Sequence, residues 1–179
     1  VRRACHPAKN RGEGGFLPPP PGKIFDSNSL AHLGWGAAVV EVEINPIEYT
    51  PRIRGVWMGI DGGRILSEKR ARRSLRASVV QALGWASGEQ MAYIGGVIPG
   101  AMDDNYKIPN PSEIPPIAID FIWNDAEDPK GIGELPFNCI PAAYLQAVSQ
   151  AMDHHFQRIP LTAKDVWEAV KLKAEESPL

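Results

Sequence analysis

The chain contains the stretch Lys130-Gly131-Ile132-Gly133-Glu134-Leu135-Pro136, at which an acidic loop gives way to an apolar segment. Glycines on both sides of Ile132 allow the backbone to approach a bulky group closely, or to adopt positive φ, where a side chain would obstruct. The carboxylate of Glu134 follows this turn, and a fixed glutamate can act as a general base toward a group seated there. A turn of this composition is also common as a solvated loop, so the stretch alone leaves both interpretations open.

The composition is that of a globular protein with one sizeable core, because 44% of the 179 residues are hydrophobic and 22% are charged. The formal net charge of −2 gives no general electrostatic reason to bind nucleic acid or a membrane surface. No apolar run approaches the roughly 20 residues that a membrane-spanning helix needs. Two cysteines, Cys5 and Cys139, do not make a disulfide framework, so we expect a cytoplasmic location.

The chain divides into a leader and a folded region. Residues 1–33 are rich in glycine and proline, and the run from Pro18 to Pro21 favours an extended polyproline conformation. The start, Val1-Arg2-Arg3, has neither a methionine nor an apolar signal core, which indicates a processed or shortened chain. We expect an extended leader over residues 1–33 and a folded domain over residues 34–179.

Three strands are predicted in the folded region. Apolar and polar residues alternate over residues 37–44, which is the period of a half-buried strand. Asn45-Pro46 marks a turn, and residues 52–60 form a second strand, so the two strands are a predicted hairpin. A third strand with one strongly apolar face is predicted over residues 117–123.

Three helices are predicted from apolar residues at helical spacing. The first covers residues 68–91, and the second covers residues 139–155 with Pro141 in its first turn. The third begins at Thr162, a good N-cap, with Asp165 at the capping-box position. Elements in this order predict an α+β fold, in which a mixed or antiparallel sheet packs against helices in two layers. All five tryptophans lie among apolar residues, so core packing is expected for each.

Five segments together resemble the C-terminal part of the molybdenum-binding subunit of the xanthine dehydrogenase/aldehyde oxidase family. The strand from Gly36 to Ile44 is similar to that family's Gly-Ala-x-x-x-Glu-Val-Glu-Val segment. The turn and helix from Asp61 to Trp85 resemble its Gly-Arg-x-Leu-Asn-Pro helix, which ends in Gln-Gly-Leu-Gly. The three other similar segments are Tyr106-Lys107-Ile108-Pro109, Lys130-Gly131-Ile132-Gly133-Glu134 and Arg158-Ile159-Pro160-Leu161-Thr162. Their order and spacing agree with the family over most of the chain.

The resemblance implies a cofactor and a set of site residues. In this family a molybdenum ion held by a pterin dithiolene oxidises an N-heterocycle or an aldehyde with oxygen derived from water, and the glutamate at the position of Glu134 is the general base. The implied cofactor, molybdenum–molybdopterin, would be shared with a partner chain. Its contacts in this chain would be Arg64, Ile65, Leu66, Ser67, Lys130, Gly131, Ile132 and Gly133. No residue of this chain is expected to ligate the metal, and iron–sulfur and FAD groups are implied only on partner subunits.

Several positions depart from the family pattern. Ser67-Glu68 replaces the family's Asn-Pro, and Ser74 stands where the helix carries a glutamine that hydrogen-bonds to the cofactor. A serine lacks the paired donor and acceptor of an amide, so that contact is lost or bridged by water. For Arg64, an ion pair with Asp61 or Glu68 is an alternative to a cofactor contact. A basic cluster near Ser74 either attracts the anionic pterin phosphate or forms a solvated face; it consists of Lys69, Arg70, Arg72, Arg73 and Arg76.

The molybdenum-binding subunits of this family are several times longer than this chain. We therefore expect a split subunit or a fragment that needs the remaining molybdenum-subunit portion as a partner, together with iron–sulfur and flavin subunits and a small-molecule substrate. The alternative is a non-catalytic remnant or assembly module that keeps the family fold without a cofactor. The serine at position 74 and the absent portion both favour that alternative.

Overall fold

The computed structural model describes residues 33–91, 93–98, 106, 108–122 and 127–176. Seven elements follow one another in these residues: β1 (Trp35–Ile44), β2 (Pro51–Asp61), α2 (Glu68–Ser87), the short 3-10 helix η1 (Pro111–Glu113), β3 (Ile117–Phe121), α4 (Leu135–Met152) and α5 (Ala163–Glu176). The predicted leader, residues 1–33, lies outside the described residues except for Leu33, so its conformation and the boundary stay a prediction. No helix in the described residues has the length and apolar composition that crossing a membrane requires.

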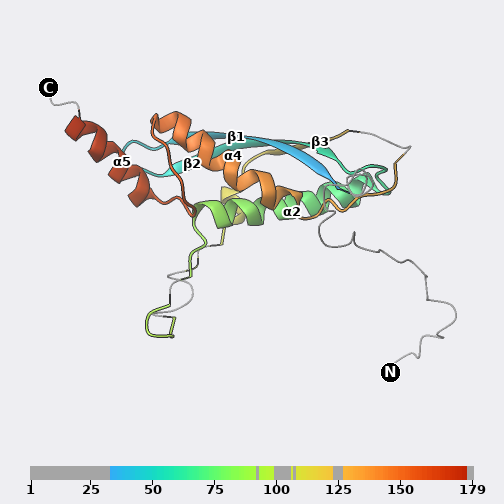
Figure 1. The fold of residues 1–179 in the computed structure, drawn as a ribbon, viewed down its shortest axis with the longest axis horizontal. Helices are drawn as coiled ribbons and strands as arrows, with labels where there is room; N and C mark the ends of the chain where they lie inside the picture. The colour runs from blue at the N-terminus through green and yellow to red at the C-terminus, as the bar shows by residue number, and fades with distance from the viewer. Residues whose placement is uncertain (1–32, 92, 99–105, 107, 123–126, 177–179) are drawn as a thin grey trace, which may run out of the picture. The chain divides into compact units, whose positions relative to one another are not determined.

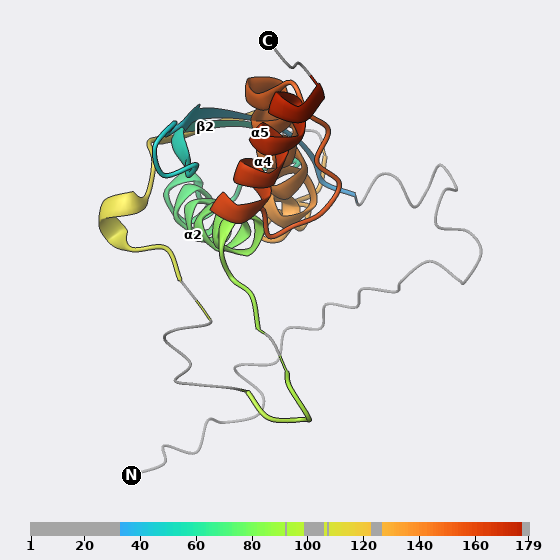
Figure 2. The same ribbon diagram turned by 90° about the vertical axis from the view of Figure 1, so that its left-hand side faces the viewer.

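The three strands form one sheet in the order β1-β2-β3. The strands β1 and β2 pair antiparallel, which confirms the predicted hairpin, and β3 pairs parallel to β2. Helices α2 and α4 lie along one face of this sheet (Figure 1), and the end view shows sheet and helices as two layers (Figure 2). The predicted α+β fold with a mixed sheet is therefore confirmed.

The core lies between the sheet and these two helices. Alternate residues of β2 and β3 point toward the helices, and Val56 and Ile60 are completely buried there. From α2, Leu75 and Val79 pack against them, as the fourfold spacing predicted, and Tyr144 of α4 is also fully buried. Burial of this apolar surface is the main force that holds the two layers together.

Two helix boundaries differ from the prediction. The helix α2 ends at Ser87 rather than at residue 91, because Glu89 pairs with Tyr106 in an antiparallel bridge and accepts a hydrogen bond from the Tyr106 hydroxyl. The helix α4 begins at Leu135 rather than at residue 139. Proline at the second position of α4 suits a first turn, whose amides have no intrahelical partner. Pro141 therefore lies inside the helix and not in its first turn.

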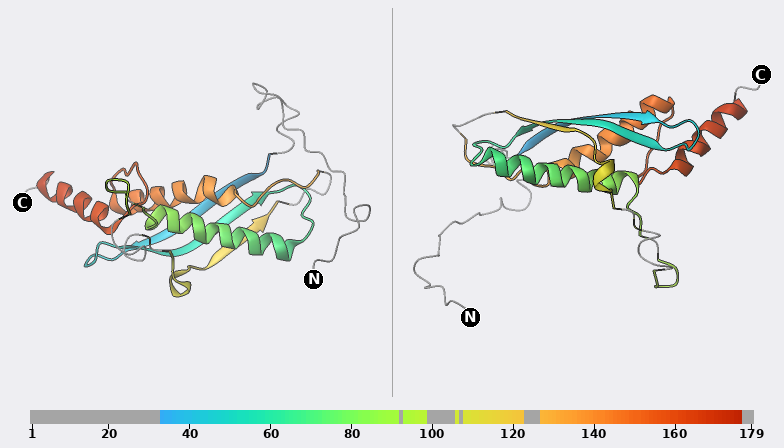
Figure 3. Two further views of the ribbon diagram at one scale, coloured as in Figure 1. Left: turned by 90° about the horizontal axis from the view of Figure 1, so that it is seen from below. Right: turned by 180° about the vertical axis from the view of Figure 1, so that it is seen from behind.

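The tryptophan prediction was wrong for the four residues that the structure describes. Their exposed fractions are 58% for Trp35, 46% for Trp57, 45% for Trp85 and 46% for Trp167, while Trp123 lies outside the described residues. Trp35 and Trp57 belong to strands whose second face carries no helix of the described chain (Figure 3). An apolar neighbourhood in the sequence therefore did not decide burial at these positions.

The third helix agrees with its predicted start. The carboxylate of Asp165 accepts hydrogen bonds from the Thr162 amide at 2.8 Å and from the Thr162 hydroxyl at 2.6 Å, and α5 follows at Ala163. Val166 is buried on the inner face of α5. Thr162 and Asp165 thus fix the beginning of the helix as a capping pair.

Candidate functional site

Two turns meet at the end of β2, although they are far apart in the sequence. The amide of Lys130 donates a hydrogen bond to the carbonyl of Gly62 at 2.9 Å. Neither glycine of the first turn could carry a side chain without a clash: a Cβ at Gly62 would lie 2.7 Å from Ile132, and a Cβ at Gly63 would lie 2.2 Å from the carbonyl oxygen of Asp128. Gly63 also has a φ of +61°, a conformation that favours glycine. The fold therefore brings the two predicted cofactor-contacting segments, residues 64–67 and 130–133, to one place.

The side chain of Lys130 points into the protein. Only 4% of it is exposed, and its ammonium lies 3.1 Å from Oδ2 of Asp61 and 2.5 Å from Oε2 of Glu127. The ion pair with Glu127, together with the hydrogen bond to and the charge of Asp61, raises the pKa of Lys130, although burial opposes them. The amide of Gly63 and the ammonium of Lys130 lower the pKa of Asp61. Sequence analysis placed Lys130 at the site but did not identify Glu127 as its partner. The sequence contains no signal that would have indicated this ion pair.

The backbone of the glycine turn, residues 130–133, is not covered by neighbouring side chains at its two glycines. A Cβ added at Gly131, which is exposed, would meet no atom within 4 Å, and one at Gly133 would come no closer than 3.9 Å, to the hydroxyl of Ser74. Ser74 is exposed on α2 and lies beside this turn. The structure thus brings the turn next to the position at which the resemblance expects a glutamine.

Glu134 leaves the turn at the N-cap of α4, with φ −100° and ψ −2°. Its side chain is exposed and forms no capping hydrogen bond. Its carbonyl accepts a hydrogen bond from the amide of Phe137 at 3.0 Å, so the backbone is held while the carboxylate stays accessible. An accessible carboxylate at a fixed backbone position can accept a proton from a group brought against it.

The other predicted contacts lie just before α2. The guanidinium of Arg64 lies 3.9 Å from a carboxylate oxygen of Asp128, and 52% of its side chain is exposed. The expected alternatives, Asp61 and Glu68, have other partners, because Asp61 pairs with Lys130 and Glu68 with Arg72. Of the next three residues, Ile65 is half-buried, Leu66 is 78% exposed, and Ser67 is the exposed N-cap of α2.

Two members of the basic cluster hold the edge of the sheet. Arg72 donates a hydrogen bond to the carbonyl of Ile119 and lies 5.1 Å above the ring of Phe121. Arg76 donates to the carbonyl of Ile117 at 3.1 Å. The guanidinium groups therefore bind carbonyls of β3 that have no strand beyond them in the described sheet. Sequence analysis did not predict this structural role for the two arginines.

Two further similar segments also meet. A Cβ at Gly84, near the end of α2, would lie 2.2 Å from a carboxylate oxygen of Glu89 and 2.8 Å from Pro109. The hydroxyl of Tyr106 donates to the other carboxylate oxygen of Glu89 at 2.5 Å, which raises the pKa of Tyr106. The glycine is needed because the loop that precedes η1 packs on the helix at this point. This contact joins the loop to the helix and involves none of the predicted cofactor-contacting residues.

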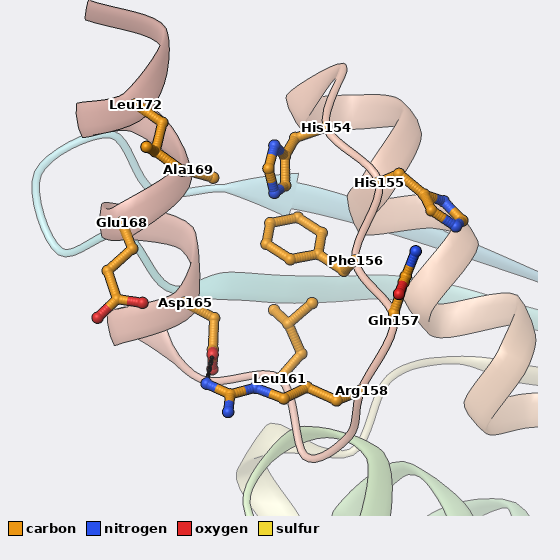
Figure 4. Close-up of a pocket in the computed structure, with 10 residues that line it drawn as sticks. All are labelled: His154, His155, Phe156, Gln157, Arg158, Leu161, Asp165, Glu168, Ala169 and Leu172. Atoms are coloured by element: carbon orange, nitrogen blue, oxygen red, sulfur yellow. Dashed lines mark hydrogen bonds and ion pairs between the residues drawn. The ribbon is translucent and has the colours of Figure 1, made fainter. Parts of the chain in front are cut away.

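A separate depression of about 480 Å³ lies between α5 and the segment that follows α4 (Figure 4). His154 contacts the ring of Phe156 edge-on, and Arg158 forms an ion pair with Asp165 at 2.6 Å across it. None of the predicted site residues lines this depression. Within the described part of the chain, no group of three or more His, Cys, Asp and Glu side chains is placed to hold a metal ion.

Known proteins are similar to this chain in both sequence and fold. The family model described as "Molybdopterin cofactor-binding domain" matches residues 13–115. The chain is 25% identical over 143 residues to a probable xanthine dehydrogenase subunit of Bacillus subtilis, covering 78% of this chain and 19% of that protein. It is 28% identical over 157 residues to the nicotine 6-hydroxylase large subunit of Paenarthrobacter nicotinovorans, covering 83% and 19%.

The fold is similar to part of a solved aldehyde oxidoreductase. Aldehyde oxidoreductase from Desulfovibrio gigas superposes with a TM-score of 0.68 at 22% identity, covering 77% of this chain and 15% of that chain. The chain thus spans about a fifth of the length of the curated relatives it matches. More than half of its residues match the family model, and the relationship that its motifs predicted is confirmed. The chain therefore belongs to the molybdopterin cofactor-binding domains of the xanthine dehydrogenase/aldehyde oxidase family.

Proposed function

We propose that this chain is part of the molybdenum-binding subunit of a molybdenum hydroxylase, which oxidises an N-heterocycle or an aldehyde with oxygen derived from water. Membership of the family supports this function. Similarity to the large subunit of a nicotine 6-hydroxylase supports an N-heterocycle as substrate. Because the chain spans about a fifth of its relatives, the proposed site is completed by the remaining portion of the molybdenum subunit. Iron–sulfur and flavin groups would lie on partner subunits.

The observation that carries the proposal is the bare backbone at Gly131. The fold needs glycine at Gly62 and Gly63, since a Cβ there would clash with the neighbouring turn. At Gly131 the fold does not require glycine, because a Cβ would meet no atom within 4 Å. A glycine with open space at its Cβ position lets a group from outside contact the backbone closely. A planar pterin cofactor is such a group.

The residues present fit the cofactor on this surface. The backbone of Lys130 to Gly133 would face molybdopterin, and Arg64 to Ser67 would contact its pterin or phosphate side. Arg64 suits the phosphate, because its guanidinium is half-exposed and its present partner Asp128 is distant at 3.9 Å. Bound there, the molybdenum cofactor supplies the redox chemistry that amino-acid side chains lack.

Glu134 is the proposed general base. Its backbone is held between the glycine turn and the first turn of α4, while its carboxylate forms no capping hydrogen bond. The side chain can therefore take a proton from the attacking nucleophile when substrate is seated against the turn. Glu134 is exposed in this chain. In the complete enzyme the partner chain would cover this side chain and exclude water from the proton transfer.

A second candidate is an assembly module that has the same fold but binds no cofactor. The observation in its favour is Ser74, whose hydroxyl lies beside Gly133 where the family has a cofactor-binding glutamine. A serine reaches less far than a glutamine and cannot donate and accept at once through an amide.

Metal analysis of the natively purified complex discriminates the two functions. The chain is tagged in its own cell, purified with its bound partners, and measured for molybdenum and for pterin absorbance. The hydroxylase proposal expects about one molybdenum per chain. Intact complex with no molybdenum and no pterin would refute the hydroxylase and favour the assembly module.

A further inference from the structure

We propose that Lys130, Asp61 and Glu127 form a lock that positions the glycine turn and hence Glu134. We call these three residues the Lys130 lock. The lock ties the two proposed cofactor-contacting segments to each other, so that they keep one relative position. Its role toward the cofactor rests on the proposed function, whereas its hold on the turn does not. The side chains of Lys130 and Asp61 are positioning groups here, because neither is proposed to touch the cofactor or the reacting atoms.

The first argument is the burial of a charge. The Lys130 side chain is 4% exposed, while the other ion pairs of known geometry among the described residues involve cations that are at least 40% exposed. A buried ammonium is costly unless carboxylates compensate it, and removal of one partner leaves an uncompensated charge. Two carboxylates surround this ammonium, at 3.1 Å and 2.5 Å. The position of this buried ammonium between two partly exposed carboxylates is therefore specified.

The second argument is that Asp61 holds both segments at once. Its Oδ1 accepts a hydrogen bond from the amide of Gly63 at 2.9 Å, which shapes the turn before Arg64. Its Oδ2 accepts one from the ammonium of Lys130 at 3.1 Å. The amide of Lys130 in turn donates to the carbonyl of Gly62 at 2.9 Å. One carboxylate thus connects the end of β2 to the start of the glycine turn.

The third argument is the flexibility that the lock must restrain. Gly131 and Gly133 have more accessible backbone conformations than other residues, and both precede Glu134. On the far side the turn is held by α4, where the amide of Leu135 donates to the carbonyl of Ile132 at 3.2 Å. On the near side the described contacts are those of Lys130, of Ile132 against Gly62, and of the Gly131 carbonyl against Gly34, where an added Cβ would lie 2.8 Å from it. Of these, only the contacts of the Lys130 side chain are ionic, so we expect their loss to loosen the near side and to widen the range of directions that the Glu134 side chain takes.

The test uses the full chain and needs neither cofactor nor activity. We compare wild type, Lys130→Met, Lys130→Arg and a matched control, Lys173→Met, which removes the ion pair of Lys173 with Asp153 at 3.2 Å. Amide hydrogen exchange is measured by NMR at positions 63 and 130 and across β2, and the backbone order parameter is measured at Glu134. Exchange reports local opening separately from global unfolding.

The lock predicts that Lys130→Met raises exchange at positions 63 and 130 by about tenfold or more, and lowers the Glu134 order parameter from the rigid toward the flexible range. Exchange in the centre of β2 should change far less. Lys130→Arg should restore a substantial part of the protection, because it keeps the positive charge. Lys173→Met should leave both turns as they are in wild type.

Two results would overturn the lock. The first is unchanged exchange and an unchanged order parameter at the turn in Lys130→Met. The second is an equal rise in exchange across β2 and the turn, since it would show that the ion pair stabilises the whole fold and positions nothing in particular. If Lys130→Met does not fold, Asp61→Asn replaces it, because the amide oxygen still accepts from Gly63 while the charge is lost. The outcome is independent of molybdenum content, so failure of the lock and failure of the hydroxylase proposal are distinguishable.

Discussion

Gly63 and Gly131 lie in neighbouring turns but are required for different reasons. Gly63 has a positive φ, and a Cβ there would lie 2.2 Å from the carbonyl oxygen of Asp128. Gly131 has open space where its Cβ would be. The fold thus explains the first glycine, whereas the proposed cofactor contact would give a reason for the second.

A pair of alanine variants tests this difference. Gly63→Ala should destabilise the chain by about 1–3 kcal/mol, because it forces a strained backbone conformation and a clash with backbone. Gly131→Ala should stay within about 0.5 kcal/mol of wild type. Urea unfolding followed by circular dichroism measures both, and equal losses in the two variants would contradict this explanation.

Gly131→Ala should nevertheless lower the molybdenum content of the native complex. The added methyl group keeps a planar group from contacting the backbone closely. Gly59→Ala is the control, since a Cβ at Gly59 also meets nothing within 4 Å but lies within β2. Equal molybdenum content in the complexes of Gly131→Ala, Gly59→Ala and wild type would count against a cofactor at the turn.

Ser74→Gln should raise the molybdenum content of the same complex, or slow the loss of molybdenum on dialysis. The serine hydroxyl lies next to the glycine turn, and an amide at this position can both donate to and accept from a bound pterin. Ser78→Gln, one turn further along α2, is the matched control. No difference between the two variants would mean that position 74 does not face the cofactor.

Sequence analysis identified the glycine turn but not the environment of its residues. The spacing of glycines around Ile132 and the resemblance placed Lys130 to Glu134 together at a site. The inward direction of the Lys130 side chain depends on Asp61, which is 69 positions away. A single sequence contains no signal for such a contact.

The helix α2 both packs on the sheet and closes its edge. Leu75 and Val79 face the core, while Arg72 and Arg76 bind the carbonyls of β3. Hydropathy spacing predicted the buried side of this helix, because apolar periodicity reports burial. It could not predict that two arginines turn back to a strand more than 40 residues away.

Arg72→Met should destabilise the chain by about 1–2 kcal/mol, because it removes a hydrogen bond to a backbone carbonyl and a cation–π contact. Arg73→Met is the matched control, since Arg73 is exposed on the same helix and makes no hydrogen bond or ion pair within the described part of the chain. Urea unfolding measures the two variants. A loss for Arg73→Met as large as that for Arg72→Met would show that the charge of the cluster matters rather than the edge contact.

Element boundaries were predicted less well than the elements themselves. The helix α4 includes Leu135 to Asn138, although sequence analysis began this helix at residue 139. The structure shows that Pro136 occupies the first helical turn. The consequence is functional, because Glu134 becomes the N-cap of a helix and not a residue in the middle of a loop.

The folded unit as a whole is a two-layer sheet and helix arrangement whose second sheet face carries exposed residues such as Trp57. The order of strands and helices predicted the layers, since an amphipathic sheet must bury one face. The exposure of Trp35 and Trp57 was not predictable, because alternation in a strand indicates two faces but not which of them is covered. The chain spans about a fifth of its relatives, and more polypeptide is proposed to accompany it.

Global stability should fall in acid partly through Asp61. The Gly63 amide and Lys130 lower its folded-state pKa below the ordinary value of 3.8, so its contribution is complete above that value and is lost as the pH falls through the folded pKa. The free energy of unfolding, from urea titrations between about pH 5 and about pH 2.5, should decline more steeply in wild type than in Asp61→Asn. If the free energy of unfolding fell equally with pH in wild type and in Asp61→Asn, Asp61 would not be a source of the acid sensitivity.

The most direct test of the account is the turnover of the native complex that carries Glu134→Gln. Glutamine keeps the size of the side chain but cannot take the proton, so turnover should fall by about a thousandfold or more while molybdenum content and partner subunits stay unchanged. A Glu134→Gln complex that retains full molybdenum content and most of the wild-type turnover would contradict the account.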